Sequence, residues 1–111
     1  MRNRFFWFFL LALTANHADA AEREIVCARY QTEYGWSNGY KVEATILKGS
    51  ELNRATRSYD YSSYSIYVVI FWSQNQASII EMDLPYLSSF GQEGEDQQGR
   101  KWEIAKTNLC F

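Results

Sequence analysis

The sequence predicts an all-β fold: a small single-domain barrel or compact sandwich of about five to six mainly antiparallel strands, closed by one disulfide between its two ends. Short runs rich in β-branched and aromatic residues recur between turn signals, at the spacing typical of small β-domains. No amphipathic helical pattern is longer than a turn or two. Two cysteines, Cys27 and Cys110, lie near the two ends of the expected mature chain.

Residues 1–20 have the pattern of a cleavable signal peptide. Arg2 and Arg4 precede a continuous apolar run over residues 5–13, and the stretch ends in Ala18-Asp19-Ala20. This apolar run is too short for a membrane span, which needs about 20 apolar residues. We therefore expect residues 21–111 to form one exported β-domain with no membrane span after cleavage, in the periplasm rather than the extracellular medium.

The first two strands are expected over residues 24–31 and 40–47. Between them, Asn38-Gly39 is a strong hairpin signal because both residues tolerate positive φ. Residues 40–47 alternate, with Tyr40, Val42, Ala44 and Ile46 on one face. That alternation predicts a half-buried strand.

The middle of the chain is expected to contain the central strand. Residues 50–55 are ambiguous between one helical turn and an irregular segment, and we favour a short turn followed by a strand over residues 56–61. Residues 64–72 are β-branched and aromatic on both faces, which predicts a central strand. Residues 73–76 then form a turn, and residues 77–83 return as its hairpin partner.

The last part of the chain is expected to be a long polar loop over residues 87–99, followed by a strand over residues 100–106. Trp102 and Ile104 should face inward in that strand. The strand patterns also assign three further aromatic side chains to the core: Tyr67, Phe71 and Trp72.

The two cysteines of the mature chain allow one intramolecular pairing, Cys27–Cys110. An exported protein of this size typically oxidises such a pair. The loop closed would span about 84 residues, and the chain-entropy model gives about 4–5 kcal/mol for it.

Chemically active residue types are scarce in the mature chain. The only histidine is His17, inside the predicted signal peptide. A catalytic triad, a Cys–His pair and a histidine zinc site therefore cannot be built from residues 21–111. We expect no enzyme activity, no cofactor and no metal site.

Two carboxylate-based alternatives were weighed against that expectation. The candidates for a glycosidase pair are Glu81 and Asp83 on a strand, or Glu93, Glu95 and Asp96 in the polar loop. Glu81 and Asp83 share a strand face, but alternation predicts that this face is solvated. The acidic, glycine-rich residues 91–99 could wrap a calcium ion, but they lack the EF-hand pattern. A carboxylate-based hydrolase is therefore only a secondary alternative. A structural envelope protein with no discrete site is a further alternative.

The charge pattern excludes a nucleic-acid partner. Removing Arg2, Arg4 and Asp19 from the 11 basic and 13 acidic residues leaves a net charge of −3. Lysine and arginine are scattered singly or in pairs, without the basic patch that binds phosphates.

An aromatic surplus is the main functional signal. The mature chain contains eight Tyr, three Trp and three Phe, and several of them lie near turns beside arginines. Tyrosine, tryptophan and arginine dominate binding hot spots. We therefore expect a protein or a glycan to bind an aromatic and arginine face composed of Tyr34, Trp36, Arg54, Arg57, Tyr59, Tyr61 and Tyr64.

Residues 71–79, Phe-Trp-Ser-Gln-Asn-Gln-Ala-Ser-Ile, are similar to the Trp-turn-Ala-x-Leu hairpin of the periplasmic inhibitors of c-type lysozyme. The chain also resembles that family in size, export signal and a disulfide joining the ends of a small β-domain. The family's Ser-Gly-x-x-Tyr inhibitory motif and its turn lysine are absent, so no functional residue is transferred. The resemblance implies an alternative function, inhibition of a secreted hydrolase.

Overall fold

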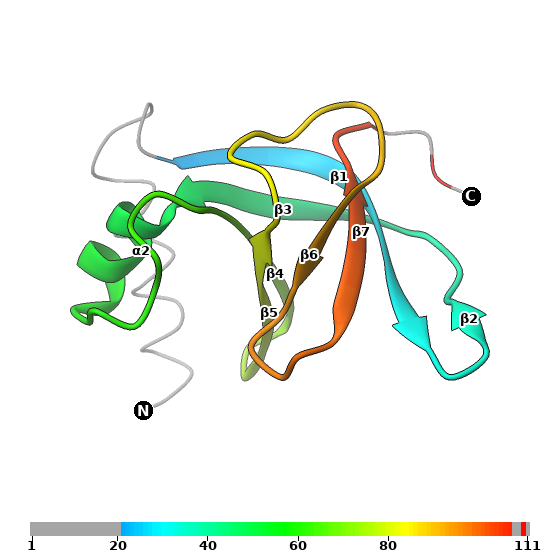
Figure 1. Ribbon diagram of the computed structural model, residues 1–111, viewed down its shortest axis with the longest axis horizontal. Coiled ribbons are helices and arrows are strands. Elements are labelled where there is room, and N and C mark those ends of the chain that lie inside the picture. The colour runs from blue at the N-terminus through cyan, green and yellow to red at the C-terminus, as the bar shows by residue number, and fades with distance from the viewer. Residues whose placement is uncertain (1–20, 108–109, 111) are drawn as a thin grey trace.

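Consecutive strands pair around a closed antiparallel barrel in the computed structural model, which describes residues 21–107 and 110 (Figure 1). The predicted signal peptide, residues 1–20, lies outside the described residues. Within the described part, six strands form the barrel, in the order β1 (Ala21–Thr32), β3 (Tyr40–Lys48), β4 (Ile66–Ser73), β5 (Gln76–Met82), β6 (Gln92–Glu95) and β7 (Lys101–Ala105). The predicted all-β fold is confirmed, and of the two expected architectures, barrel and compact sandwich, it is the barrel.

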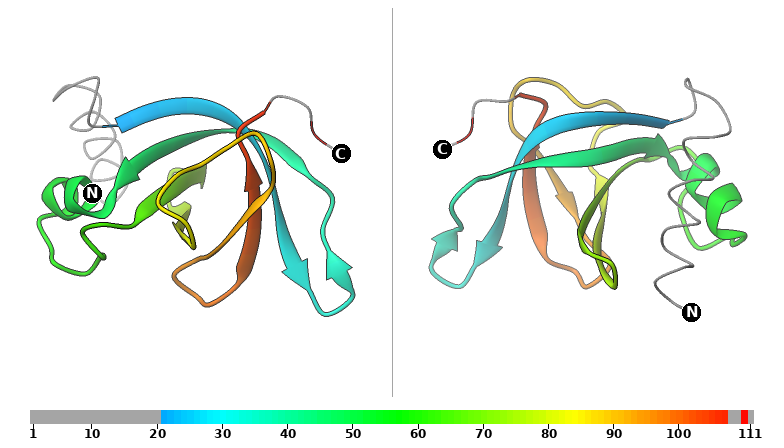
Figure 2. Two further views of the ribbon diagram at one scale, coloured as in Figure 1. Left: turned by 45° about the horizontal axis from the view of Figure 1, so that its top comes forward. Right: turned by 180° about the vertical axis from the view of Figure 1, so that it is seen from behind.

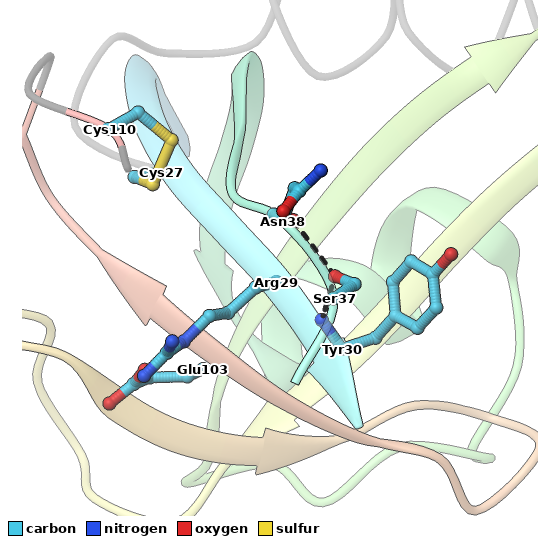
Figure 3. Close-up of polar contacts among 7 residues, drawn as sticks. All are labelled: Cys27, Arg29, Tyr30, Ser37, Asn38, Glu103 and Cys110. Atoms are coloured by element: carbon cyan, nitrogen blue, oxygen red, sulfur yellow. Dashed lines mark hydrogen bonds and ion pairs between the residues drawn. A yellow bond between two sulfur atoms is a disulfide. The ribbon is translucent and has the colours of Figure 1, made fainter. Parts of the chain in front are cut away.

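The long strand β1 closes the barrel because it pairs both with the next barrel strand, β3, and with the last one, β7. Its first part pairs with β3 and its second part with β7, and Cys27 belongs to both registers, opposite Lys41 and Ala105. The predicted Cys27–Cys110 disulfide is present, with a Cα–Cα distance of 5.2 Å (Figure 3). It therefore ties Cys110 to the strand that pairs with both β3 and β7.

The hydrophobic core inside the barrel is formed by alternate residues of five strands: β1, β3, β4, β5 and β7. As predicted, Trp102 and Ile104 face inward, with exposed fractions of 3% and 0%. Ala44 and Ile46 of β3 are buried in the same cluster, and Val42 is packed against it. The remaining buried members of this cluster are Val26, Ala28, Val68, Ile70, Ile80 and Met82.

The strand β4 is buried on both faces, as its continuous apolar sequence predicts. Val68 and Ile70 point into the barrel, while Tyr67 and Val69 belong to a second apolar cluster outside it. Leu52 of the helix α2 (Gly49–Thr56) is fully buried in this outer cluster. The helix therefore covers a face of the barrel wall that would otherwise expose its apolar side chains.

The strand predicted over residues 56–61 is wrong, because this stretch contains the end of α2 and a loop. Leu52 anchors the helix on the outer cluster. The side-chain amide of Asn53 then donates to the Tyr61 carbonyl and accepts from the Tyr61 amide, at 2.9 and 3.0 Å. These contacts satisfy the loop backbone without a partner strand. Arg57 ends the helix in the left-handed region, at φ 56°.

The long polar loop predicted over residues 87–99 is also wrong in part, since it contains β6. Gly94 makes this strand possible. A Cβ at this position would lie 2.6 Å from the Glu81 carbonyl oxygen and 2.9 Å from the Met82 sulfur. Only glycine therefore allows β6 to approach β5.

The hairpin predicted at Asn38-Gly39 forms a few residues earlier. A short strand β2 (Gly35–Trp36) pairs with the end of β1, and the turn between them contains Tyr34. Gly35 has φ 116°, and the Thr32 hydroxyl bonds to its carbonyl and to the Tyr34 amide. The Thr32 side chain and the freedom of Gly35 thus place the turn before Asn38-Gly39.

Trp72 is another correction to the predicted core. Tyr67 is 4% exposed, and Phe71 is half-buried against the outer cluster. Trp72, however, is 39% exposed at the end of β4. It lies at the rim of the barrel, where it lines a pocket.

Candidate functional site

An open pocket of about 410 Å³ lies at one end of the barrel, and we call it the rim pocket. It lies at the end where the β4–β5 and β6–β7 turns are found, at the bottom of Figure 1. Its wall is formed by Tyr30, Tyr40, Trp72, Gln76, Ala77, Ser78, Asp96, Gln97, Gln98, Arg100 and Trp102. Four of these side chains are aromatic, and each comes from a different strand.

The four aromatic rings form one contiguous cluster. Trp72 stacks on Trp102 with ring centroids 6.1 Å apart, and Tyr40 meets Trp72 edge to face at 5.9 Å. Tyr30 lies 5.3 Å from Trp102 and stacks parallel to Tyr40 at 6.2 Å. Trp72 and Tyr40 are 39% and 40% exposed, whereas Trp102 is buried beneath them. The buried ring thus supports two rings with accessible surface.

Hydrogen bonds fix both indoles. The Trp72 Nε1–H donates to the Ser78 hydroxyl at 2.9 Å, and the Trp102 Nε1–H donates to Asp96 Oδ2 at 2.9 Å. Asp96 Oδ1 also accepts the amides of Gln98 and Arg100, at 2.9 and 3.0 Å. The turn from β6 to β7 therefore holds the pocket wall through a single carboxylate.

Gln97 seals the barrel wall beside the pocket. The described register pairs β5 with β6 only at Glu81 and Met82. Further along β5, the Gln97 side chain replaces a strand. Its Oε1 accepts the Ile79 amide and its Nε2–H donates to the Ala77 carbonyl, both at 2.9 Å.

Arg100 supplies a positive charge to the pocket. Its guanidinium carbon lies 4.8 Å from the centroid of the Tyr30 ring, in cation–π geometry. The neighbouring Tyr40 has its pKa raised above 10.0, first by a hydrogen bond with Tyr30. Its hydroxyl therefore stays neutral at physiological pH and can act as a hydrogen-bond donor.

The seven residues of the predicted binding face do not form one surface. Tyr34 and Trp36 lie on the β1–β2 hairpin, where Arg29 places its guanidinium 5.1 Å from the Trp36 ring. The other five lie in or after α2, and the views place α2 and β2 at opposite ends of the molecule (Figure 1 and Figure 2). Binding at either group stays a prediction.

The group near α2 is itself divided. Arg54, Arg57 and Tyr59 line a shallow hollow of about 470 Å³. Tyr61 packs edge to face on Tyr67, with ring centroids 5.4 Å apart, and so belongs to the outer cluster. Tyr64 is 90% exposed and does not line the hollow.

The rim pocket is not among the sites predicted from the sequence, although the sequence contains a signal for it. In an up-and-down barrel, the end of one strand and the start of the next lie at the same rim. Tyr30 lies near the end of β1, Tyr40 starts β3, Trp72 lies near the end of β4 and Trp102 near the start of β7. Aromatic residues at those strand ends that share a rim therefore form a sequence pattern that predicts this pocket.

Tyr30 could also have been assigned from alternation. It projects to the opposite side of β1 from Arg29, which lies outside the barrel and pairs with Glu103 at 2.6 Å (Figure 3). Residues on the side of Tyr30, such as Ala28, are part of the barrel core.

Of the carboxylates considered as alternatives, Asp96 lines the rim pocket and accepts the hydrogen bond of the Trp102 indole, whereas the others do not line it. Glu81 and Asp83 are exposed, and Glu81 accepts a hydrogen bond from the Ser65 hydroxyl at 2.6 Å. Glu93 and Glu95 are exposed residues of β6. Across residues 21–107 and 110, no three histidine, cysteine, aspartate or glutamate residues are grouped so that they could hold a metal ion.

The same described residues include no helix that is long and apolar enough to cross a membrane. The chain matches no protein-family model, no curated protein and no solved structure. The fold defines a small six-stranded β-barrel protein with an aromatic pocket at one rim. Its function must therefore be argued from the pocket itself.

Proposed function

We propose that this protein is an exported, non-enzymatic binding protein whose rim pocket takes a glycan. The observation that carries the proposal is the accessible surface of Trp72 and Tyr40, held in place by a buried Trp102. Aromatic faces carry negative partial charge, and the C–H bonds on one side of a pyranose ring are weakly positive, so the two stack. A fixed aromatic wall loses little entropy when the sugar binds.

The polar groups of the pocket suit hydroxyl groups. Gln76 and Gln98 are exposed and contribute side-chain amides, each able to donate and accept. The Tyr40 hydroxyl, hydrogen-bonded with Tyr30, adds acceptor lone pairs. These groups satisfy sugar hydroxyls, which also donate and accept.

A peptide ligand fits this pocket less well. Extended peptides gain affinity by adding main-chain hydrogen bonds to an exposed strand edge. The adjacent edge of β5 already has its Ala77 carbonyl and Ile79 amide bonded to Gln97. A peptide would first have to displace that side chain.

Inhibition of a secreted hydrolase is the second candidate, supported by the β1–β2 hairpin. Tyr34 is 93% exposed at its tip, and the Thr32 hydroxyl braces the turn. A rigid projecting hairpin with an aromatic tip suits an enzyme cleft.

An affinity capture separates the two functions. The oxidised protein is immobilised and exposed to a cell-envelope extract and to a panel of secreted hydrolases that includes lysozymes. Retained glycans and proteins are identified by mass spectrometry. Trp72→Ala and Tyr34→Ala are run in parallel, with far-ultraviolet circular dichroism as the folding control.

Each outcome decides between the candidates. Glycans retained by the wild type and by Tyr34→Ala, and lost from Trp72→Ala, would support the proposed function. One hydrolase retained stoichiometrically, and lost only from Tyr34→Ala, would overturn it in favour of inhibition. If glycans bound equally to Trp72→Ala, the rim pocket would not be the site.

A further inference from the structure

We infer that the glycan taken by the rim pocket carries a carboxylate, as a uronic acid does, and that Arg100 binds this group. This inference rests on the proposed function. It concerns the charge of the ligand, which the aromatic wall alone does not determine.

Arg100 is placed to meet a ligand in the pocket. Its side chain is exposed, and its guanidinium group lies over the face of Tyr30. Tyr30 in turn contacts Trp102 and Tyr40. A sugar on the aromatic wall would therefore have a cation at its border.

Arg100 has no carboxylate partner among the described residues. The ion pairs found there involve other basic side chains: Arg29, Arg54 and Lys106. The cation–π contact with Tyr30 leaves the edges of the guanidinium plane free to donate. A planar fork of N–H donors matches a carboxylate bidentately.

Asp96, the other charged residue of the pocket wall, does not neutralise Arg100. Its two carboxylate oxygens accept three hydrogen bonds, two from backbone amides and one from the Trp102 indole. These hydrogen bonds hold the carboxylate against the turn and the indole, and no ion pair joins it to Arg100. The pocket thus offers an acidic ligand one available cation.

The inference is tested with a matched pair of ligands. Tetragalacturonate carries carboxylates, and its fully methyl-esterified form has nearly the same shape without the charge. Dissociation constants are measured by isothermal titration calorimetry at low salt, using the oxidised wild-type protein. We expect the acid to bind about tenfold more tightly than the ester, because a charge-assisted pair is stronger than a neutral one.

Three variants identify the residue responsible. Arg100→Gln should abolish the preference, so that this variant binds the acid and the ester with equal affinity. Arg100→Lys should retain part of the preference, since it keeps the charge without the planar fork. Lys48→Gln is the charge-matched control: Lys48 is exposed at the end of β3 that joins α2, and this variant should retain the full preference.

The outcomes separate the inference from the proposed function. Equal affinity of the wild type for acid and ester would overturn the inference while leaving a glycan-binding pocket. A preference that survives in Arg100→Gln would overturn the role of Arg100. If neither ligand bound, the inference would fail, and the affinity capture would decide independently on the proposed function.

Discussion

The indole N–H of Trp102 donates a 2.9 Å hydrogen bond to Asp96 Oδ2, and Trp102 is only 3% exposed. The same carboxylate accepts both amides that define the turn from β6 to β7. One side chain therefore links the position of the buried ring to the turn, which is also held by backbone hydrogen bonds from Asp96 to Arg100 and from Gly99 to Asp96.

Asp96→Asn should destabilise the protein by about 1–3 kcal/mol, because one position of the new amide would place an N–H₂ group against an N–H donor. The free energy of unfolding in urea measures the loss. Asp83→Asn, at an exposed position, is the matched control and should change it by less than about 0.5 kcal/mol. Equal losses in both variants would contradict a special role for Asp96.

Gln97→Ala should open the barrel wall locally. Without this side chain, the Ile79 amide and the Ala77 carbonyl lose their partner, at a cost of about 1 kcal/mol for a partly solvated site. Hydrogen exchange followed by NMR should show faster exchange of the Ile79 amide. Gln98→Ala is the control, and an unchanged Ile79 amide in Gln97→Ala would show that another group protects β5.

Stability should decline at alkaline pH because of two tyrosines in the outer cluster. Burial raises the pKa of Tyr67 above 10.0, and burial also raises the pKa of Tyr61, with a further contribution from Asp60. The unfolded chain therefore ionises first. The stabilisation is complete below pH 10 and is lost as the pH rises from the unfolded-state pKa through the folded-state pKa.

The alkaline decline is measured as the free energy of unfolding between pH 8 and about pH 11. Tyr67→Phe should lower stability at pH 8, because the Ser62 amide loses its bond to the Tyr67 hydroxyl, but should flatten the decline. Tyr64→Phe, at a position 90% exposed, should leave the slope as in the wild type. An unchanged slope in Tyr67→Phe would assign the decline to other groups.

Removing the disulfide by Cys27→Ala with Cys110→Ala should lower the free energy of unfolding by about 4–5 kcal/mol in the chain-entropy model. That loss is comparable to the whole stability of many small domains. Urea unfolding of the oxidised wild type and the double variant measures it. A loss below about 1 kcal/mol would show that the strand pairing alone closes the barrel.

Sequence patterning predicted the barrel well where burial alone decides the structure. The apolar run on both faces of β4 and the alternation around Trp102 reflect burial directly. The disulfide was predictable for a different reason, because two cysteines allow only one intramolecular pairing. The misplaced elements depend on specific long-range contacts. The helix α2 is stabilised by the burial of Leu52 in the outer cluster, and β6 is stabilised by pairing with β5 at Gly94. Neither contact can be read from the local sequence.

The site was harder to predict than the fold, because proximity in space depends on strand order. Tyr30 and Trp102 are far apart in the sequence and meet only because β1 pairs with β7. Exposed turn residues such as Tyr34 and Tyr59 looked more functional in sequence, since turns are readily identified. In this barrel, however, the topology brings the ends of β1 and β4 and the starts of β3 and β7 to the same rim, where their aromatic side chains form the pocket.

The pairing of β1 with β7 has a consequence for self-association. A closed ring of strands has no free edge, but the same strands unrolled at this seam would form a curved sheet with two edges, each able to template a second molecule. The disulfide beside the seam holds those edges together during transient opening. Reduction would therefore make edge-to-edge polymerisation easier.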